Sequence, residues 1–132
     1  MVRLVYRDFP LPIHASAELA AVASRCAADQ GDFWAMHAQL FDTYSVEWGG
    51  VPNRDRPVMI ELAGNLGLDT TTFEDCLNNE QVVTAVREEV ANATWIGVRS
   101  TPHFFINGQS LIGAAPYDSF QRAIEQAKEA EE

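Results

Sequence analysis

The sequence predicts a mixed α/β fold in which a helical segment interrupts a small sheet. Residues 2–7 are rich in β-forming side chains and alternate weakly, which is typical of a short strand. Residues 15–96 carry apolar side chains at helical spacing, and residues 103–112 have the pattern of a β-hairpin. One strand can share a sheet with a distant hairpin only if the helices between them are an insertion. The order of the elements therefore indicates the α/β class.

The first elements are bounded by proline, serine and glycine. The strand expected at Val2 to Arg7 ends at the two prolines of residues 9–12. A helix is expected over Ala15 to Asp29, with Ser16 as its N-cap and Gly31 after its C-terminal end.

The second helix is expected to begin after Asp32 and to bury one wide face. Residues 45–54 contain two glycines and a proline and are expected to form a loop, and Gly67 stops a third helix over residues 57–66. The apolar and aromatic stripe of the second helix consists of Phe33, Met36, His37, Leu40, Phe41 and Tyr44.

The C-terminal third of the chain ends in a hairpin and a helix. Asn107-Gly108 is the dipeptide that a type I′ hairpin turn requires, so it fixes where the two strands reverse. The elements expected after Gly67 are a short helix from Asp69 through Leu77, a helix over residues 81–96, strands at 103–106 and 110–112, and a helix over 117–128.

The charge of the chain disfavours nucleic acids and anionic membranes as partners. The chain has 132 residues, 47% hydrophobic residues and a formal net charge of −10, which are values of one globular domain with an acidic surface. Such a surface disfavours nucleic acid, whose phosphates need lysine and arginine, and it disfavours an anionic membrane surface. No apolar run approaches the roughly 20 residues of a membrane-spanning helix.

Four short segments of the sequence carry a resemblance to a known family: VRLVYRDFPL from Val2, RCAADQGDFW from Arg25, LGLD from Leu66 and GVRSTPHFFING from Gly97. In their order and spacing they resemble the DsbA-like branch of the thioredoxin superfamily over nearly the whole chain. That resemblance implies a thioredoxin-like fold, incomplete at its start, with residues 1–14 and 97–132 in the thioredoxin-like part and residues 15–96 as an inserted helical domain. It also implies a bacterial thiol-disulfide oxidoreductase acting on protein substrates.

The resemblance explains a proline at the start of the last strand pair. In thioredoxin-like proteins the bond at the position of Thr101-Pro102 is cis, and the residue before the proline offers its backbone N–H and C=O to an extended substrate peptide. The expected substrate-binding residues are therefore Thr101, Pro102 and His103. An ordinary trans proline opening a strand is the structural alternative.

The chain departs from the family in its redox chemistry. Family members carry a strand and a Cys-x-x-Cys helix before the strand that corresponds to Val2–Arg7, and this sequence has no Cys-x-x-Cys. Thiol exchange needs a thiolate of lowered pKa and a nearby resolving thiol. We therefore predict no catalytic residue and no dithiol activity in the chain as given, and whether it is an enzyme stays open.

The two cysteines have two interpretations. Cys26 and Cys76 each lie within a predicted helix and are 50 residues apart. They can be two buried thiols acting as small apolar side chains. Their even number favours a structural disulfide between them, and so does the resemblance, because it implies a family of exported proteins and disulfides persist outside the cytoplasm.

No metal or cofactor is expected. His14, His37 and His103 are scattered without the spacing of metal ligands. His103 follows the predicted cis-proline and could tune thiols placed near it, or merely cap the strand.

Two other functions remain open at this stage. One is a redox-inactive peptide-binding module on a thioredoxin fold. The other is a relative of the kappa glutathione transferases, or an isomerase of that group, which would use glutathione. The resemblance to a family of exported proteins implies an extracytoplasmic location. Residues 1–8 lack the apolar core of a signal peptide, so a cytoplasmic location is the alternative.

The missing central strand predicts a homodimer. Removing one strand from a sheet leaves a gap of about 10 Å between its neighbours and exposes two rows of backbone groups. We expect Val2–Arg7 and His103–Ile106 to recover a partner by self-association. The alternatives are direct pairing of these two strands within one chain and a start of the chain that has been lost or trimmed.

Overall fold

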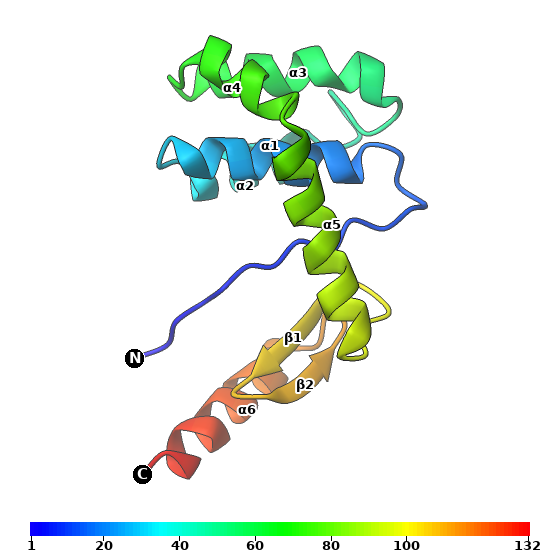
Figure 1. Cartoon of the computed structure of the whole chain (residues 1–132). Coiled ribbons are helices and arrows are strands. Elements are labelled where there is room, and N and C mark those ends of the chain that lie inside the picture. The colour runs from blue at the N-terminus through cyan, green and yellow to red at the C-terminus, as the bar shows by residue number, and fades with distance from the viewer. The chain divides into compact units, whose positions relative to one another are not determined.

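The computed structural model describes all residues from 1 to 132 and contains six helices and one two-stranded sheet (Figure 1). Its contacts divide the chain into two compact units, Met1–Asn92 and Ala93–Glu132, which are described separately. In chain order the elements are α1 (Ala17–Asp29), α2 (Phe33–Thr43), α3 (Pro52–Asn65), α4 (Thr70–Leu77), α5 (Glu80–Trp95), β1 (His103–Ile106), β2 (Gln109–Ile112) and α6 (Tyr117–Ala130).

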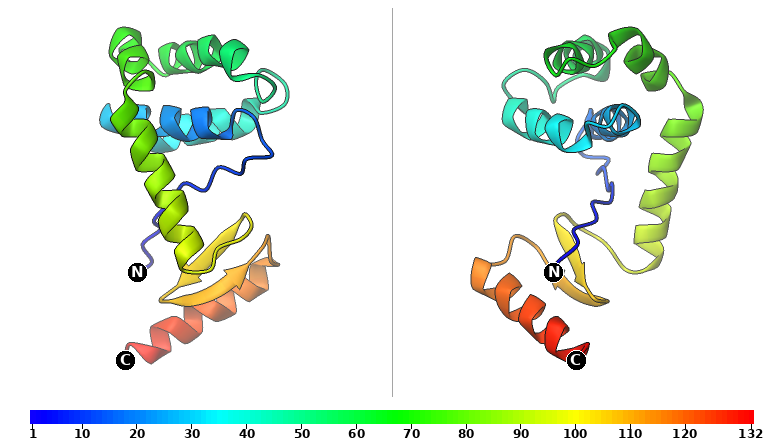
Figure 2. Two further views of the ribbon diagram at one scale, coloured as in Figure 1. Left: turned by 45° about the vertical axis from the view of Figure 1, so that its right-hand side comes forward. Right: turned by 90° about the vertical axis from the view of Figure 1, so that its left-hand side faces the viewer.

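The first unit is a helical bundle. Helices α1 and α2 lie side by side, and α3 and α4 pack on them from one direction (Figure 2). Apolar side chains one helical turn apart on each helix meet in a single core. Its fully buried larger members are Phe73, Met36, Met59, Leu62, Val86 and Cys26.

Local sequence signals set the ends of these helices. Asp69 caps α4, accepting a hydrogen bond from the backbone N–H of Thr72 at 2.7 Å. Gly31, beyond the end of α1, has φ +85°, a conformation that favours glycine. Ser16 stands at the N-cap position of α1 without capping it, because its hydroxyl donates instead to the buried carboxylate of Asp55.

The predicted strand at Val2–Arg7 is wrong. These residues run as an extended segment that belongs to no sheet, since the one sheet contains only β1 and β2 (Figure 1). A strand is defined by its ladder, so β-forming side chains without a neighbouring strand leave the segment extended but unpaired.

Two smaller expectations also need correction. Helix α3 begins at Pro52, inside the expected loop, because a proline suits the first turn of a helix. On α2 only Met36 and Leu40 of the predicted stripe are buried, whereas Phe41 remains 68% exposed.

The second unit is a hairpin covered on one face by a helix. Strands β1 and β2 pair antiparallel with Phe104 opposite Leu111, and Asn107 and Gly108 turn the chain at φ +46° and +86°. Both positive φ values are those of the predicted type I′ turn. Helix α6 lies along the hairpin (Figure 2). Phe120 of this helix meets Phe104 edge-on, with ring centroids 4.8 Å apart.

The assignment of residues 1–14 and 97–132 to one thioredoxin-like part remains a prediction. None of the six helices is both long and apolar enough to cross a membrane.

Candidate functional site

The loop before β1 holds the three residues predicted to bind substrate. Gly97 follows α5 with φ +101°, and the Thr101–Pro102 peptide bond is cis, as the resemblance implies. The Pro102 carbonyl accepts the Gly113 N–H at 2.8 Å, which ties the loop to the end of the hairpin. Thr101 and Pro102 are exposed, and His103 is half-buried at the first position of β1.

The backbone of Thr101 is unpaired within the chain. Neither its N–H nor its C=O takes part in a backbone hydrogen bond, while the neighbouring Pro102 carbonyl does. Exposed, unpaired backbone groups beside a strand are a site where an extended peptide can add by main-chain hydrogen bonds.

His103 presents its ring to the open face of the hairpin. Its Nε2 lies 3.0 Å from the Ser110 hydroxyl, and its ring stacks on Phe105 with centroids 4.7 Å apart. This face also carries Ile112, and Phe105 and Ile112 are 44% and 64% exposed. The loop therefore continues into a face that is apolar except for the His103 ring. Such a face can contact the apolar and polar side chains of a bound peptide, and it offers a metal ion only one ligand.

No group of three or more histidine, cysteine or acidic side chains in the chain could hold a metal ion. His14, His37 and His103 do not come together as ligands.

The two cysteines are joined in the first unit. Cys26 on α1 and Cys76 on α4 form a disulfide with a Cα–Cα distance of 5.7 Å. Cys26 is buried, whereas Cys76 is half-buried, and its sulfur lies 3.9 Å from the Asp29 carboxylate. No free thiol is left in the chain. The disulfide links two helices of one bundle, which is a structural position.

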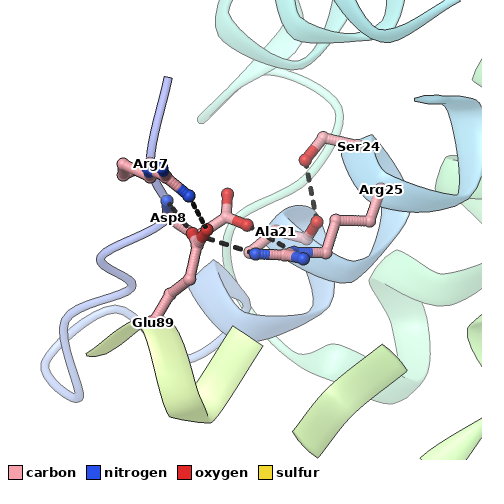
Figure 3. A network of polar contacts seen from close by, with 6 residues as sticks. All are labelled: Arg7, Asp8, Ala21, Ser24, Arg25 and Glu89. Atoms are coloured by element: carbon pink, nitrogen blue, oxygen red, sulfur yellow. Dashed lines mark hydrogen bonds and ion pairs between the residues drawn. The ribbon is translucent and has the colours of Figure 1, made fainter. Parts of the chain in front are cut away.

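A polar network anchors the extended segment to the bundle (Figure 3). The Arg25 guanidinium lies 2.7 Å from the carboxylate of Asp8 and 2.9 Å from that of Glu89. Glu89 on α5 also accepts the Asp8 backbone N–H at 2.7 Å and pairs with Arg7 at 3.2 Å. One glutamate thus joins the end of the extended segment to α1 and α5.

The pKa values of the two carboxylates of this network, Asp8 and Glu89, are shifted in opposite directions. Burial raises the pKa of Asp8, and the hydrogen bond and charge of Arg25 only partly offset that rise. Burial also disfavours the charged form of Glu89, but the Asp8 N–H and the charge of Arg25 outweigh it and lower the pKa of Glu89. Glu89 is therefore the carboxylate whose ionised form the fold stabilises.

Sequence reasoning missed an aromatic surface on the first unit. The ring of Tyr6 lies 4.8 Å from that of His37, which in turn lies 4.8 Å from Phe41. Phe33 and Trp34 complete the cluster, and Trp34 is 51% exposed. The stripe on α2 was the available signal, but the helical period alone does not reveal which part of a stripe stays uncovered.

Comparison with known proteins identifies the family. A family model described as Thioredoxin matches residues 1–126. The chain belongs to the thioredoxin family. Its structure is an incomplete thioredoxin-like fold with a helical region.

A solved structure shows the same fold. A thioredoxin-like oxidoreductase from Silicibacter pomeroyi DSS-3 superposes with a TM-score of 0.72 over 96% of this chain and 68% of that chain, at 24% identity. At that identity the likeness shows the fold alone.

The curated relatives are much longer proteins. The chain is 32% identical over 96% of its length to a Na(+)/H(+) antiporter NhaA 1 of Salinispora arenicola and 34% identical over 83% to an NhaA of Herminiimonas arsenicoxydans. It spans 18% and 16% of those proteins. The similarity is therefore to a minor part of each.

Proposed function

We propose that these residues form the substrate-binding part of a DsbA-like protein-disulfide oxidoreductase. The observation that carries the proposal is the exposed, unpaired backbone of Thr101 at the entrance to β1. Membership of the thioredoxin family supports it, since that family acts on thiols and disulfides of proteins. Thr101, Pro102 and His103 are the proposed contact residues.

The chemistry of the loop favours an extended polypeptide. Thr101 offers one donor and one acceptor to a main chain, a pairing that does not depend on the peptide's side chains. The exposed rings and Ile112 beside it can cover an apolar side chain of the same peptide. A ligand as small as glutathione would contact fewer of these residues than an extended peptide would.

The described residues supply no thiol-exchange chemistry of their own. To oxidise a substrate, the Cys26–Cys76 disulfide would have to be attacked by the substrate's thiolate, but Cys26 is buried in the core and Cys76 is half-buried beside the Asp29 carboxylate. If that bond were reduced, the carboxylate of Asp29 near Cys76 would disfavour the thiolate form. We therefore propose that this chain binds peptides without oxidising them.

Peptide binding can be measured directly on the loop. The probe is reduced, alkylated insulin B chain, titrated into isotopically labelled protein and followed by amide chemical shifts. We expect the Thr101 amide to shift. Thr101→Pro, which removes the donor, should weaken binding between about two- and tenfold, the range for one hydrogen bond. Thr101→Ala keeps the N–H and is the matched control.

Shifts confined to other surfaces, or equal binding by Thr101→Pro and Thr101→Ala, would contradict this assignment of the site.

A redox assay tests the proposed inactivity of this chain. Reduced ribonuclease should refold no faster with this chain than without it. Stoichiometric oxidation that is lost in Cys26→Ala would overturn the proposed inactivity. Reading the DNA before the Met1 codon separates the part of an oxidoreductase from a redox-inactive binding module. An in-frame Cys-x-x-Cys supports the oxidoreductase, and a stop codon supports the binding module. A serine in place of the first cysteine supports a glutathione-using relative.

The extracytoplasmic location and the homodimer also remain proposals.

A further inference from the structure

The turn of the hairpin combines three features that favour a chemical reaction of its asparagine. Asn107 and Gly108 are both exposed, so water reaches the peptide bond that joins them. The Gly108 N–H takes part in no backbone hydrogen bond. Apart from its chain neighbours, no atom lies within 4 Å of the position that a Cβ of Gly108 would occupy. The backbone nitrogen that follows Asn107 is therefore free and unshielded.

An asparagine followed by glycine can lose its side-chain amide by cyclisation. The Gly108 nitrogen gives up its proton and bonds to the side-chain carbonyl carbon of Asn107, the bond from that carbon to Nδ2 breaks, and ammonia leaves. Water then opens the cyclic imide. Opening at the side-chain carbonyl gives aspartate, and opening at the main-chain carbonyl gives isoaspartate, in which the backbone passes through the side chain. Glycine hinders the ring least, because it has no side chain.

Helix α6 holds the amide group that must leave. The Asn107 Nδ2 donates to Oε1 of Glu131 at 2.8 Å. Glu131 is the C-cap residue of α6, and its N–H donates to the Lys128 carbonyl, so the helix fixes its backbone. Cyclisation requires the side chain to turn over its own backbone, whereas this contact ties it to another element. The contact should therefore slow the reaction without preventing it, because hydrogen bonds exposed to solvent open readily.

The product of the reaction cannot keep this contact. Aspartate and isoaspartate both carry a carboxylate where Asn107 had a donor, and an ionised carboxylate only accepts hydrogen bonds. That carboxylate would face Glu131, and the two like charges should separate the end of α6 from the turn. Isoaspartate also lengthens the backbone of a two-residue turn whose φ values, +46° and +86°, suit its present length.

We propose that Asn107 is a site of spontaneous deamidation and that Glu131 sets the rate of the reaction. Water is the only co-reactant that the reaction needs. The modification replaces an attractive contact between the hairpin and α6 by a repulsive one, so it loosens the second unit at the turn.

Peptide mapping by mass spectrometry, after incubation of the chain in water enriched in heavy oxygen, tests the site. We expect the peptide that contains Asn107 to incorporate heavy oxygen and to contain isoaspartate. Asn92 is the internal control, because it is also exposed but the N–H of Ala93 after it lies within α5, where it donates to the helix. Conversion of Asn107 no faster than that of Asn92 would overturn the proposal.

Variants of α6 test the control of the rate. Glu131→Ala removes the acceptor and should speed the loss of the amide about two- to tenfold, the range for one hydrogen bond. Glu131→Gln keeps an acceptor oxygen and should stay closer to the rate of the unaltered chain. Glu129→Ala, which removes another exposed carboxylate of the same helix, is the matched control and should leave the rate unchanged. An unchanged or slower rate in Glu131→Ala would refute the role of Glu131.

Asn107→Asp tests the effect of the product charge by itself. Asp-Gly also suits a type I′ turn, so this variant changes the contact and keeps the turn. We expect amide hydrogen exchange in the last turn of α6 to become about two- to tenfold faster. Adding Glu131→Gln places the donor on the helix and the acceptor on the turn, and it should restore the slower rate. If this swap of donor and acceptor does not restore it, repulsion at this contact is excluded.

Discussion

Breaking the Cys26–Cys76 disulfide should remove a large part of the stability of the first unit. The bond joins residues 50 positions apart, on α1 and α4. In the chain-entropy model a closed loop of that length stabilises the fold by about 4 kcal/mol, because it restricts the unfolded chain. Domains of this size have a total of about 5–15 kcal/mol, so the loss should be plain in an unfolding curve.

The variant for this test is Cys76→Ala. Cys76 is the half-buried partner, so its truncation leaves the buried sulfur of Cys26 within the core and creates little cavity. With a urea slope of about 1–3 kcal/mol per molar, the midpoint should fall by about 1–4 M. Urea unfolding followed by circular dichroism gives the midpoint and the slope together.

Reduction provides the matched control. Dithiothreitol should lower the midpoint of the unaltered chain to near that of Cys76→Ala and should leave the variant where it is. Equal unfolding free energies for the oxidised chain and Cys76→Ala would refute the loop-closure reasoning. So would two reactive thiols in the denatured, unreduced protein, because the bond would then be absent.

Two other predictions concern the half-buried carboxylate of Glu89 and the buried carboxylate of Asp55. Glu89→Gln should destabilise the fold by roughly 1–3 kcal/mol, because three groups on Arg7, Asp8 and Arg25 lose a charged acceptor, while Glu88→Gln on the exposed side of α5 should have little effect. Since the fold lowers the pKa of Glu89, its contribution is present above the unfolded pKa of about 4.3 and is lost as the pH falls through the folded pKa. Thermal melts between pH 3 and 7 should therefore show less acid destabilisation in Glu89→Gln, and parallel curves would contradict this assignment. Asp55→Ala should cost roughly 2–4 kcal/mol, because the Ser16 hydroxyl and the Gly49 N–H both lose their acceptor. Faster hydrogen exchange at the Gly49 amide would locate that loss, and unchanged exchange would count against it.

The local elements were predictable from the sequence because short-range signals specify them. Asn107-Gly108 favours the positive φ values of a type I′ turn wherever it occurs, so the hairpin could be placed to within a residue. Asp69 and the glycines after the helices likewise act through their own backbone neighbourhood. The candidate loop at Thr101-Pro102 could also be located from the sequence, because its residues are contiguous and lie in a segment that resembles the family.

What the sequence could not decide depends on partners that lie far away along the chain. Val2–Arg7 has the composition of a strand, but hydrogen bonding in a sheet needs a second strand, and this segment has none in the structure. Its place is fixed instead by Arg25 and Glu89, 17 and 81 residues from Asp8. The aromatic stripe of α2 shows the same limit. Periodicity identifies a face, but only the packed bundle determines that Met36 is buried while Phe41 is left open to solvent.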